Sequence, residues 1–245
     1  MKAVILAAGR GSRLEGLTDD LPKCMVSLAG TPLLHRQISA LKEVGIEEVA
    51  VVRGYRAEAI SGPDVHFIDN PRWSQSNMVV SLQAALPWLK PQGGIISYAD
   101  IFYAPEAVTA LMETEGDLVL TYDVNWQTLW ESRQENPLDD AETFKLAPNG
   151  DLKEIGKQPQ ALEEVEGQYM GLLRFTGPGI AAIEKLLSSM TQENIDRLDM
   201  TSLLSLLLES GERIVPIAYE GEWGEVDTKS DLELYEQRFA EKAGL

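Results

Sequence analysis

Short apolar segments that suit buried strands alternate with segments of helical periodicity over the first half of this 245-residue chain. The strand-like segments are residues 1–6, 48–52, 65–68, 94–98 and 117–122, and helical patterns fill the intervals at 31–45, 76–89 and 105–112. Chains in which strands and helices alternate form a mostly parallel sheet that is covered by helices on both faces. We therefore predict an α/β fold with a mainly parallel sheet.

The second half of the chain is less regular. Residues 125–140 are polar and favour a loop or a short helix, and Pro148-Asn-Gly-Asp151 is a strong turn signal between strands at 143–146 and 152–155. A strand at 168–176, helices at 179–187 and 200–208, a strand at 213–219 and a closing helix at 229–245 complete the pattern. Neither a repeat nor a long linker interrupts the chain, so we predict one domain over residues 1–245.

The formal charge of −18, from 39 acidic and 21 basic residues, argues against non-specific binding to nucleic acid or to an anionic membrane. An anionic ligand must therefore be held by a local basic patch or through metal ions. The single cysteine, Cys24, excludes an intramolecular disulfide and a zinc site built from several cysteines. No signal peptide and no apolar run of about 18 residues is visible, which predicts a cytoplasmic protein.

The first strand leads into a loop of small residues, Leu6-Ala-Ala-Gly-Arg-Gly-Ser-Arg-Leu14, and Leu21-Pro-Lys23 follows shortly after it. Glycine lets the backbone approach a ligand closely, and free backbone N–H groups can hold phosphate oxygens. Arg10, Arg13 and Lys23 add positive charge. The loop lacks the Gly-Lys-Ser/Thr of a Walker motif and has Leu14 where a dinucleotide fingerprint needs its third glycine. The pattern predicts a phosphate site of another type.

These residues resemble the signature of nucleotidyltransferases of the sugar-nucleotide pyrophosphorylase type, in which a small-residue loop with Gly-x-Gly-Ser/Thr-Arg precedes Pro-Lys. The resemblance implies a Rossmann-like three-layer α/β/α fold whose loop wraps the phosphates of a nucleotide. Residues 1–123 would form the nucleotide-binding half, 124–228 an inserted β-rich acceptor-binding region, and 229–245 a closing helix. The nucleotide-binding candidates are Leu6, Ala7, Ala8, Gly9, Arg10, Gly11, Ser12, Arg13, Lys23, Asn70, Ser76 and Asn77.

Two aspartates occupy positions that suit a magnesium site. Asp100 ends the strand at 94–98, where open parallel sheets bind ligands, and Asp227 precedes the closing helix. Each is also compatible with a turn or a helix cap. The resemblance implies that both hold a catalytic Mg²⁺, and that Lys23 and Arg13 act with them in catalysis.

The acceptor-binding candidates are Tyr98, Lys157, Tyr169 and Glu225. Lys157 resembles the second lysine of the family, which binds the phosphate of the acceptor, although an ordinary exposed lysine fits its context equally well. Glu225 is either a further metal ligand or a solvated acid. Trp73, Trp126, Trp130 and Trp223 are candidates for an aromatic cage around a quaternary ammonium group, with core packing as the alternative.

Several segments resemble the bacterial cytidylyltransferases: Ser76 to Leu82, Ser97 to Ile101 and Glu225 to Asp227. Asn136 to Phe144 and Met200 to Ser202 look most like the capsule-associated branch that acts on phosphoglutamine. The resemblance implies Mg²⁺-dependent transfer of CMP from CTP to a small phosphorylated or phosphonate acceptor, such as phosphoglutamine, phosphocholine or aminoethylphosphonate. The product would be a CDP- or CMP-activated precursor for capsule or surface polysaccharide modification.

Two alternatives stay open at this point. A sugar-1-phosphate nucleotidyltransferase would use a different nucleoside triphosphate with the same loop and lysine. A catalytically silent regulatory homologue would keep the fold without turnover, but such a chain should have lost Lys23, Asp100 or Asp227, all of which are present. The sequence is also compatible with a homodimer, and it identifies neither the oligomeric state nor the acceptor.

Overall fold

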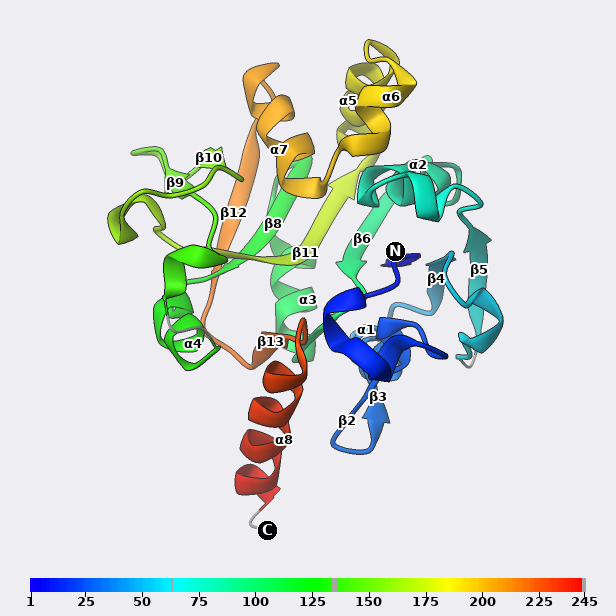
Figure 1. The fold of residues 1–245 in the computed structure, drawn as a ribbon. Helices are drawn as coiled ribbons and strands as arrows, with labels where there is room; N and C mark the ends of the chain where they lie inside the picture. The colour runs from blue at the N-terminus through cyan, green and yellow to red at the C-terminus, as the bar shows by residue number, and fades with distance from the viewer. Residues whose placement is uncertain (63, 134–135, 244–245) are drawn as a thin grey trace.

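A seven-stranded sheet forms the centre of the structure, a computed structural model that describes residues 1–62, 64–133 and 136–243 (Figure 1). Across the sheet the strand order is β12-β8-β11-β6-β1-β4-β5. The strands are β1 (Lys2–Ala7), β4 (Glu48–Arg53), β5 (Val65–Asp69), β6 (Gly93–Tyr98), β8 (Leu118–Asp123), β11 (Gln168–Thr176) and β12 (Ile214–Tyr219). β11 is antiparallel to both of its neighbours, and the other pairs are parallel. The predicted mainly parallel sheet is confirmed.

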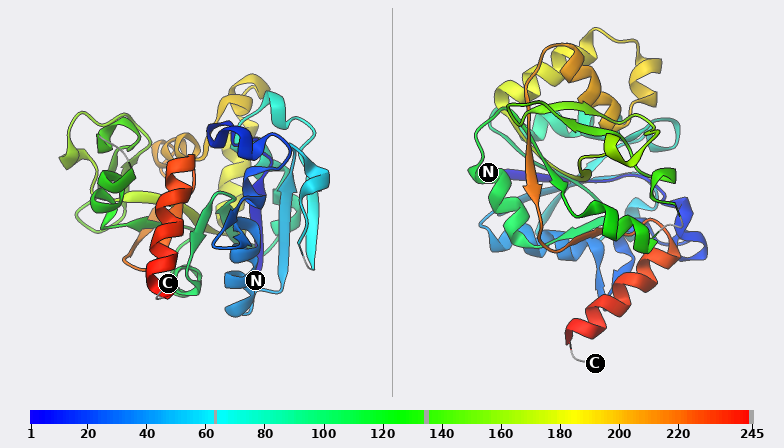
Figure 2. Two further views of the ribbon diagram at one scale, coloured as in Figure 1. Left: turned by 60° about the horizontal axis from the view of Figure 1, so that its bottom comes forward. Right: turned by 90° about the vertical axis from the view of Figure 1, so that its left-hand side faces the viewer.

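Helices cover both faces of this sheet, as the alternation of side chains along β1 illustrates. Ala3 and Ile5 pack into one apolar cluster with α1 (Leu33–Glu43) and α3 (Pro105–Glu113). Val4 and Leu6 pack into a second cluster with helices of the opposite face. That face carries α2 (Met78–Leu89), α5 (Gly177–Ser188) and α7 (Met200–Glu209). The result is the predicted three-layer arrangement, seen from two further sides in Figure 2.

Three small two-stranded sheets lie outside the central one. The predicted hairpin is present as β9 (Phe144–Leu146) and β10 (Leu152–Ile155). Residues 31–32, expected to open a helix, instead pair as β3 (Thr31–Pro32) with β2 (Ser27–Leu28). The third sheet pairs β7 (Ile101–Tyr103) with β13 (Trp223–Glu225), and neither strand was predicted, because three residues are too few to show a period.

The remaining helices are α4 (Trp126–Arg133), α6 (Gln192–Arg197) and α8 (Lys229–Ala243). α4 occupies the stretch predicted as a loop or short helix, of which residues 134–135 lie outside the described part. α8 is the predicted closing helix, and its expected last residues, 244–245, also lie outside it. α6 was not predicted. Among the described residues, no helix is both long and apolar enough to cross a membrane.

A bulge in β11 shapes one edge of the candidate site. The register of β11 against β8 shifts between Tyr169 and Leu173, and Gly171 within this bulge has a φ of 75°. A Cβ atom at Gly171 would lie 2.7 Å from Cγ of Tyr98. The rings of Tyr98 and Tyr169 meet edge to face with centroids 5.7 Å apart. Glycine therefore lets β11 bend closely over the end of β6.

We predict that Gly171→Ala destabilises the fold more than Gly211→Ala. Both glycines have positive φ, so each alanine pays about 1–2 kcal/mol for a left-handed backbone. Only a Cβ at Gly171 also meets a packed ring, which adds about 1–3 kcal/mol, whereas the space around Gly211 is open. Urea unfolding of both variants measures the difference. Equal losses of unfolding free energy would contradict this account of the bulge.

Candidate functional site

Four charged side chains from separate segments meet beyond the carboxyl ends of β1 and β6. Lys23 comes from a short 3₁₀ helix, η2 (Lys23–Met25), and its Nζ lies 2.7 Å from Oδ2 of Asp100. Lys23 also donates to Asp227, which follows β13. Arg13, from the 3₁₀ helix η1 (Ser12–Thr18), places Nη2 3.1 Å from Oδ2 of Asp227. The structure thus brings together the four residues predicted to act in catalysis.

The pairing of β7 with β13 sets the distance between the two aspartates. Glu225 pairs with Ile101 in this ladder, and the backbone N–H of Val226 donates to the carbonyl oxygen of Asp100 at 2.9 Å. On the other side, Gln37 of α1 donates to the carbonyl oxygen of Ile101. Asp100 and Asp227 are therefore fixed by backbone hydrogen bonds on both chain segments, although they lie far apart in the sequence.

Gly11 allows Lys23 to reach the aspartates. Its φ is 72°, and a Cβ at this position would lie 2.6 Å from Cβ of Lys23. The second glycine of the loop, Gly9, has open space around it instead. Close packing against Lys23 therefore explains why glycine is needed at position 11, but it does not explain the glycine at position 9.

A divalent metal fits the carboxylates gathered here. One carboxylate oxygen from each of Asp100, Glu225 and Asp227 lies within 4.8 Å of the others. Oδ1 of Asp100 is buried and has no hydrogen-bond partner among the described residues, so it is available as a ligand atom. Hard oxygen donors of this kind suit Mg²⁺. Sequence reasoning named Asp100 and Asp227 as ligands and left open whether Glu225 is a further metal ligand or a solvated acid. The structure places Glu225 in the cluster.

The cluster also perturbs the acidity of its members. Burial alone lowers the pKa of Lys23, but the charges of Asp100 and Asp227 outweigh it and hold that pKa above its usual value. For Asp227, burial raises the pKa, but the attraction of Lys23 more than compensates and lowers it below the usual range. Burial and the two aspartates raise the pKa of Glu225. Lys23 stays cationic and Asp227 anionic as a result.

Two cavities meet at this cluster. The first, which we call the loop cavity, has a volume of about 290 Å³ and lies between the glycine-rich loop and Lys23. The second, the tyrosine cavity, measures about 280 Å³ and is lined by Tyr98, Tyr169, Glu225 and Asp227. Arg13 and Met78 line both, so the two cavities adjoin. A larger cavity of about 640 Å³ lies elsewhere, between α4, β13 and α8.

Most of the predicted nucleotide-binding residues line these spaces. Leu6, Ala7, Gly9, Gly11, Ser12, Arg13 and Lys23 line the loop cavity. Ala8, Ser76 and Asn77 line a smaller neighbouring cavity of about 130 Å³, which also contacts Leu6, Gly9 and Met78. Asn77 caps α2 by accepting from the N–H of Met78. Met78, which the sequence reasoning missed, lines all three cavities, and its position directly after the expected cap was the available signal.

Three predicted residues point to other partners. Arg10 pairs with Asp19 at 3.3 Å on the surface and lines neither main cavity. Asn70 is buried and donates to Oγ of Ser81. The side chain of Lys157 is 62% exposed and pairs with Glu154, three residues earlier. The structure therefore does not bring Lys157 to the cluster, and the ordinary exposed lysine is the interpretation that its surroundings favour.

The tryptophans do not form the cage that was considered for a quaternary ammonium group. Trp126, Trp130 and Trp223 are buried and pack against one another, with ring centroids 6.4 and 6.2 Å apart along the series. The guanidinium of Arg133 lies over the ring of Trp130. Trp73 packs against Tyr55 instead. Core packing is therefore the role that three of the four tryptophans have.

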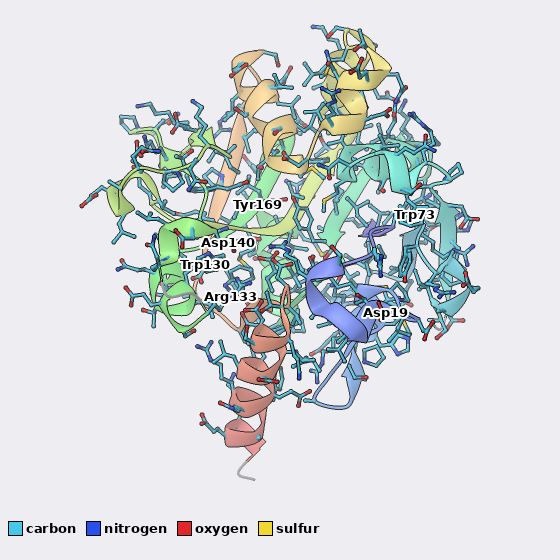
Figure 3. All side chains as sticks on the ribbon, viewed as in Figure 1. Asp19, Trp73, Trp130, Arg133, Asp140 and Tyr169 are labelled. Carbon is cyan, nitrogen blue, oxygen red and sulfur yellow. The ribbon has the colours of Figure 1, made fainter. Side chains whose placement is uncertain are left out.

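Acidic side chains from the irregular half of the chain complete the tyrosine cavity. Asp140, Glu142 and Asp199 line it, and Oγ1 of Thr201 contacts Glu142 at 3.3 Å. Figure 3 labels Asp140 and Tyr169 near the centre of the molecule. Sequence reasoning identified Asp199 only as the expected cap of the helix that follows it, a role that it has in the structure. It quoted the segment that contains Asp140 and Glu142 but did not single out either residue, because nothing in their spacing marks which acids face inward.

The chain matches known proteins both in a family model and in sequence over nearly its whole length. A family model described as the MobA-like NTP transferase domain matches residues 3–146. A CTP:phosphoglutamine cytidylyltransferase from Campylobacter jejuni is 37% identical over 250 aligned residues, covering 96% of this chain and 98% of that protein.

Two solved structures share the fold. The inositol-1-phosphate CTP transferase from T. maritima superposes with a TM-score of 0.78 at 20% identity, covering 100% of this chain and 97% of that one. The CTP:phosphocholine cytidylyltransferase from Streptococcus pneumoniae does so with a TM-score of 0.72 at 19% identity, covering 97% and 98%.

Cys24 should be unreactive in the folded protein although it follows Lys23 directly. Its side chain is buried, and burial raises the pKa of its thiol to about 12, so the nucleophilic thiolate is scarce at about pH 8. We expect iodoacetamide to leave the native protein unmodified and to alkylate it fully in denaturant, as followed by mass spectrometry. Rapid alkylation of the native protein would show that this part of the site opens to solvent.

Proposed function

Because this chain belongs to the family of MobA-like NTP transferase domains, we propose that it is a CTP-dependent cytidylyltransferase. It transfers CMP from CTP to a small phosphorylated or phosphonate acceptor and releases pyrophosphate. The observation that carries the proposal is the meeting of Arg13, Lys23, Asp100 and Asp227 where the loop cavity joins the tyrosine cavity. The relative from Campylobacter jejuni supports CTP and a phosphorylated acceptor by its similarity over nearly the whole chain.

The loop cavity is the proposed place of the nucleotide. Small residues of the loop let the phosphates lie against backbone N–H groups, and the ammonium of Lys23 and the guanidinium of Arg13 lie at the same wall. A net charge of −18 repels a triphosphate, and these two cations offset that repulsion locally. Gly11 serves binding indirectly, since it lets Lys23 take this position.

Asp100 and Asp227, with Glu225 beside them, would hold the divalent ion, for which we propose Mg²⁺. When bound, the ion supplies positive charge that offsets the negative charge of the phosphates. The protein's own part is to keep the carboxylates ionised and in place. Lys23 does this for Asp227 by lowering its pKa, and the ladder of β7 and β13 fixes the backbone of both segments.

The tyrosine cavity is the proposed place of the acceptor. An anionic oxygen of its phosphate or phosphonate attacks the α-phosphorus of CTP in line and forms a new P–O bond. The bond between the α-phosphorus and the oxygen that bridges it to the β-phosphorus breaks. Pyrophosphate leaves with that electron pair. The attacking oxygen is already anionic near neutral pH, so no general base is needed, and catalysis consists of positioning and electrostatic stabilisation. Lys157 has no part in this proposal, because it is exposed and paired elsewhere.

Other expectations stay predictions from the sequence. They are the cytoplasmic location, the homodimer, the division at residues 123 and 228, and the link to capsule or surface polysaccharide. None of them is needed for the chemistry proposed here.

The activity is tested by crossing nucleotides with acceptors. CTP, UTP, GTP and dTTP are each incubated with Mg²⁺ and phosphoglutamine, phosphocholine, 2-aminoethylphosphonate or mannose 1-phosphate, and pyrophosphate release is measured. We expect release with CTP and one of the first three acceptors. Release with another nucleotide and mannose 1-phosphate would replace the proposal with a sugar-1-phosphate nucleotidyltransferase, and no release in any combination would favour a regulatory homologue.

Asp100→Asn should lower kcat by roughly 100-fold or more, the scale of losing one electrostatic contact to the transition state. Asp123→Asn is the matched control, because Asp123 also lies at the carboxyl end of a strand of the central sheet, yet lines the separate cavity at α4 and α8. Pyrophosphate release at saturating CTP compares them. Full turnover by Asp100→Asn would remove the metal role assigned to this residue.

A further inference from the structure

A buried arginine that the proposed chemistry does not use lies next to the acidic cluster. Arg133 ends α4, and its side chain is 1% exposed. Nε donates to Oδ1 of Asp231 at 2.8 Å and Nη2 to Oδ2 at 3.2 Å, which makes a two-point ion pair between α4 and α8. In Figure 3 Arg133 lies near the start of α8. Two-point pairs of arginine with carboxylate fix direction as well as distance.

Asp231 connects this ion pair to the backbone of Asp227. It is 3% exposed, and the same Oδ2 accepts from the backbone N–H of Asp227 at 3.0 Å and from that of Thr228 at 2.9 Å. Oγ1 of Thr228 accepts in turn from the N–H of Asp231. The turn between β13 and α8 is therefore held by the carboxylate that Arg133 orients, and the backbone of Asp227 is part of this turn.

The second end of the guanidinium faces the cluster itself. Nη1 of Arg133 lies 3.8 Å from Oε2 of Glu225, and Nη2 lies 4.0 Å from Oδ2 of Asp227. Nη1 is buried and makes no hydrogen bond within the described ranges. A buried donor of this kind normally has a partner. Its positive charge offsets part of the repulsion among the three carboxylates.

We propose that Arg133 and Asp231 are positioning residues of the metal site. They hold the carboxylates of Asp227 and Glu225 in the arrangement that binds a divalent cation, and so link α4, a helix from the irregular half of the chain, to the reacting centre. The inference rests on the proposed function in that it takes the acidic cluster to be a metal site. Neither residue touches the reacting atoms.

The test compares Arg133→Lys and Arg133→Gln with wild type in the 245-residue chain. Mn²⁺ affinity is measured from the electron paramagnetic resonance signal of free Mn²⁺, with and without CTP, and each variant's Tm is recorded. We expect Mn²⁺ affinity to fall by about 10- to 100-fold, as is typical when a group that orients metal ligands is changed. Lysine keeps the charge but lacks the forked donor, so it should rescue part of the loss that glutamine causes.

Arg174→Lys is the matched control. Arg174 is also a buried arginine, and it donates to the backbone carbonyl oxygens of Leu111, Thr114 and Gly116, away from the cluster. Its replacement should lower Tm while leaving Mn²⁺ affinity within twofold of wild type. If Arg133→Lys and Arg133→Gln likewise lower Tm but leave Mn²⁺ affinity within twofold of wild type, Arg133 merely holds two helices together, and the inference is wrong.

Asp231→Asn provides a second, independent reading and decides the matter if the Arg133 variants do not fold. The amide oxygen can still accept from the turn but no longer carries the charge that orients Arg133, so Mn²⁺ affinity and the apparent KM for Mg²⁺ should both worsen. Unchanged Mn²⁺ binding by this variant overturns the inference.

The outcomes also separate the two proposals. Wild type that binds Mn²⁺ in an Arg133-dependent way but transfers no nucleotide refutes the proposed function alone. Wild type that turns over CTP while the variants bind Mn²⁺ normally refutes the inference alone. Wild type that binds no Mn²⁺, even with CTP, refutes the inference together with the metal role assigned to Asp100 and Asp227.

Discussion

The ion pairs of Lys23 with Asp100 and Asp227 are the interaction on which the rest of the site depends. Carboxylates that are brought together away from water repel one another, and each loses the solvation of its charge. A largely buried lysine side chain that pairs with two of them offsets both costs, and this position is possible because Gly11 leaves room for it. Arg13 and Arg133, which both lie near Oδ2 of Asp227, extend this compensation. The repulsion among the clustered carboxylates is thereby offset by three cationic side chains.

The sheet places this cluster, but the small β7–β13 ladder sets its dimensions. Asp100 follows β6, one of the central strands, so its position is inherited from the core. Asp227 is 204 residues from Lys23 and reaches it because β13 pairs with β7 outside the main sheet. A three-residue strand contributes little stability, and the hydrogen bonds of Asp231 to the turn after it supply the additional constraint. The result is a site that joins rigid core to peripheral elements.

The sequence predicted the order of the long elements and the residues of the glycine-rich loop, because both depend on local patterns. It also singled out Asp100 and Asp227, whose positions next to a strand and a helix are visible locally. It could not show that Lys157 pairs with Glu154 or that Asn70 donates a hydrogen bond to Ser81. Nor could it show that Asp140 and Glu142 line the tyrosine cavity. Those outcomes are decided by which surface each segment presents after packing. Arg133 was invisible for the same reason, since its partners come from α8 and β13.

The β7–β13 pairing also has a consequence for how the molecule is made. A chain is synthesised from its amino terminus, and its early segments can begin to fold first. The glycine-rich loop, Lys23 and Asp100 are made well before β13 and Asp227, so a growing chain has the loop but lacks two of the three carboxylates of the cluster. Closing a contact over so many residues is entropically costly, so we expect it to form late in folding. Completion of the acidic cluster would thus report that the entire domain has reached its native topology.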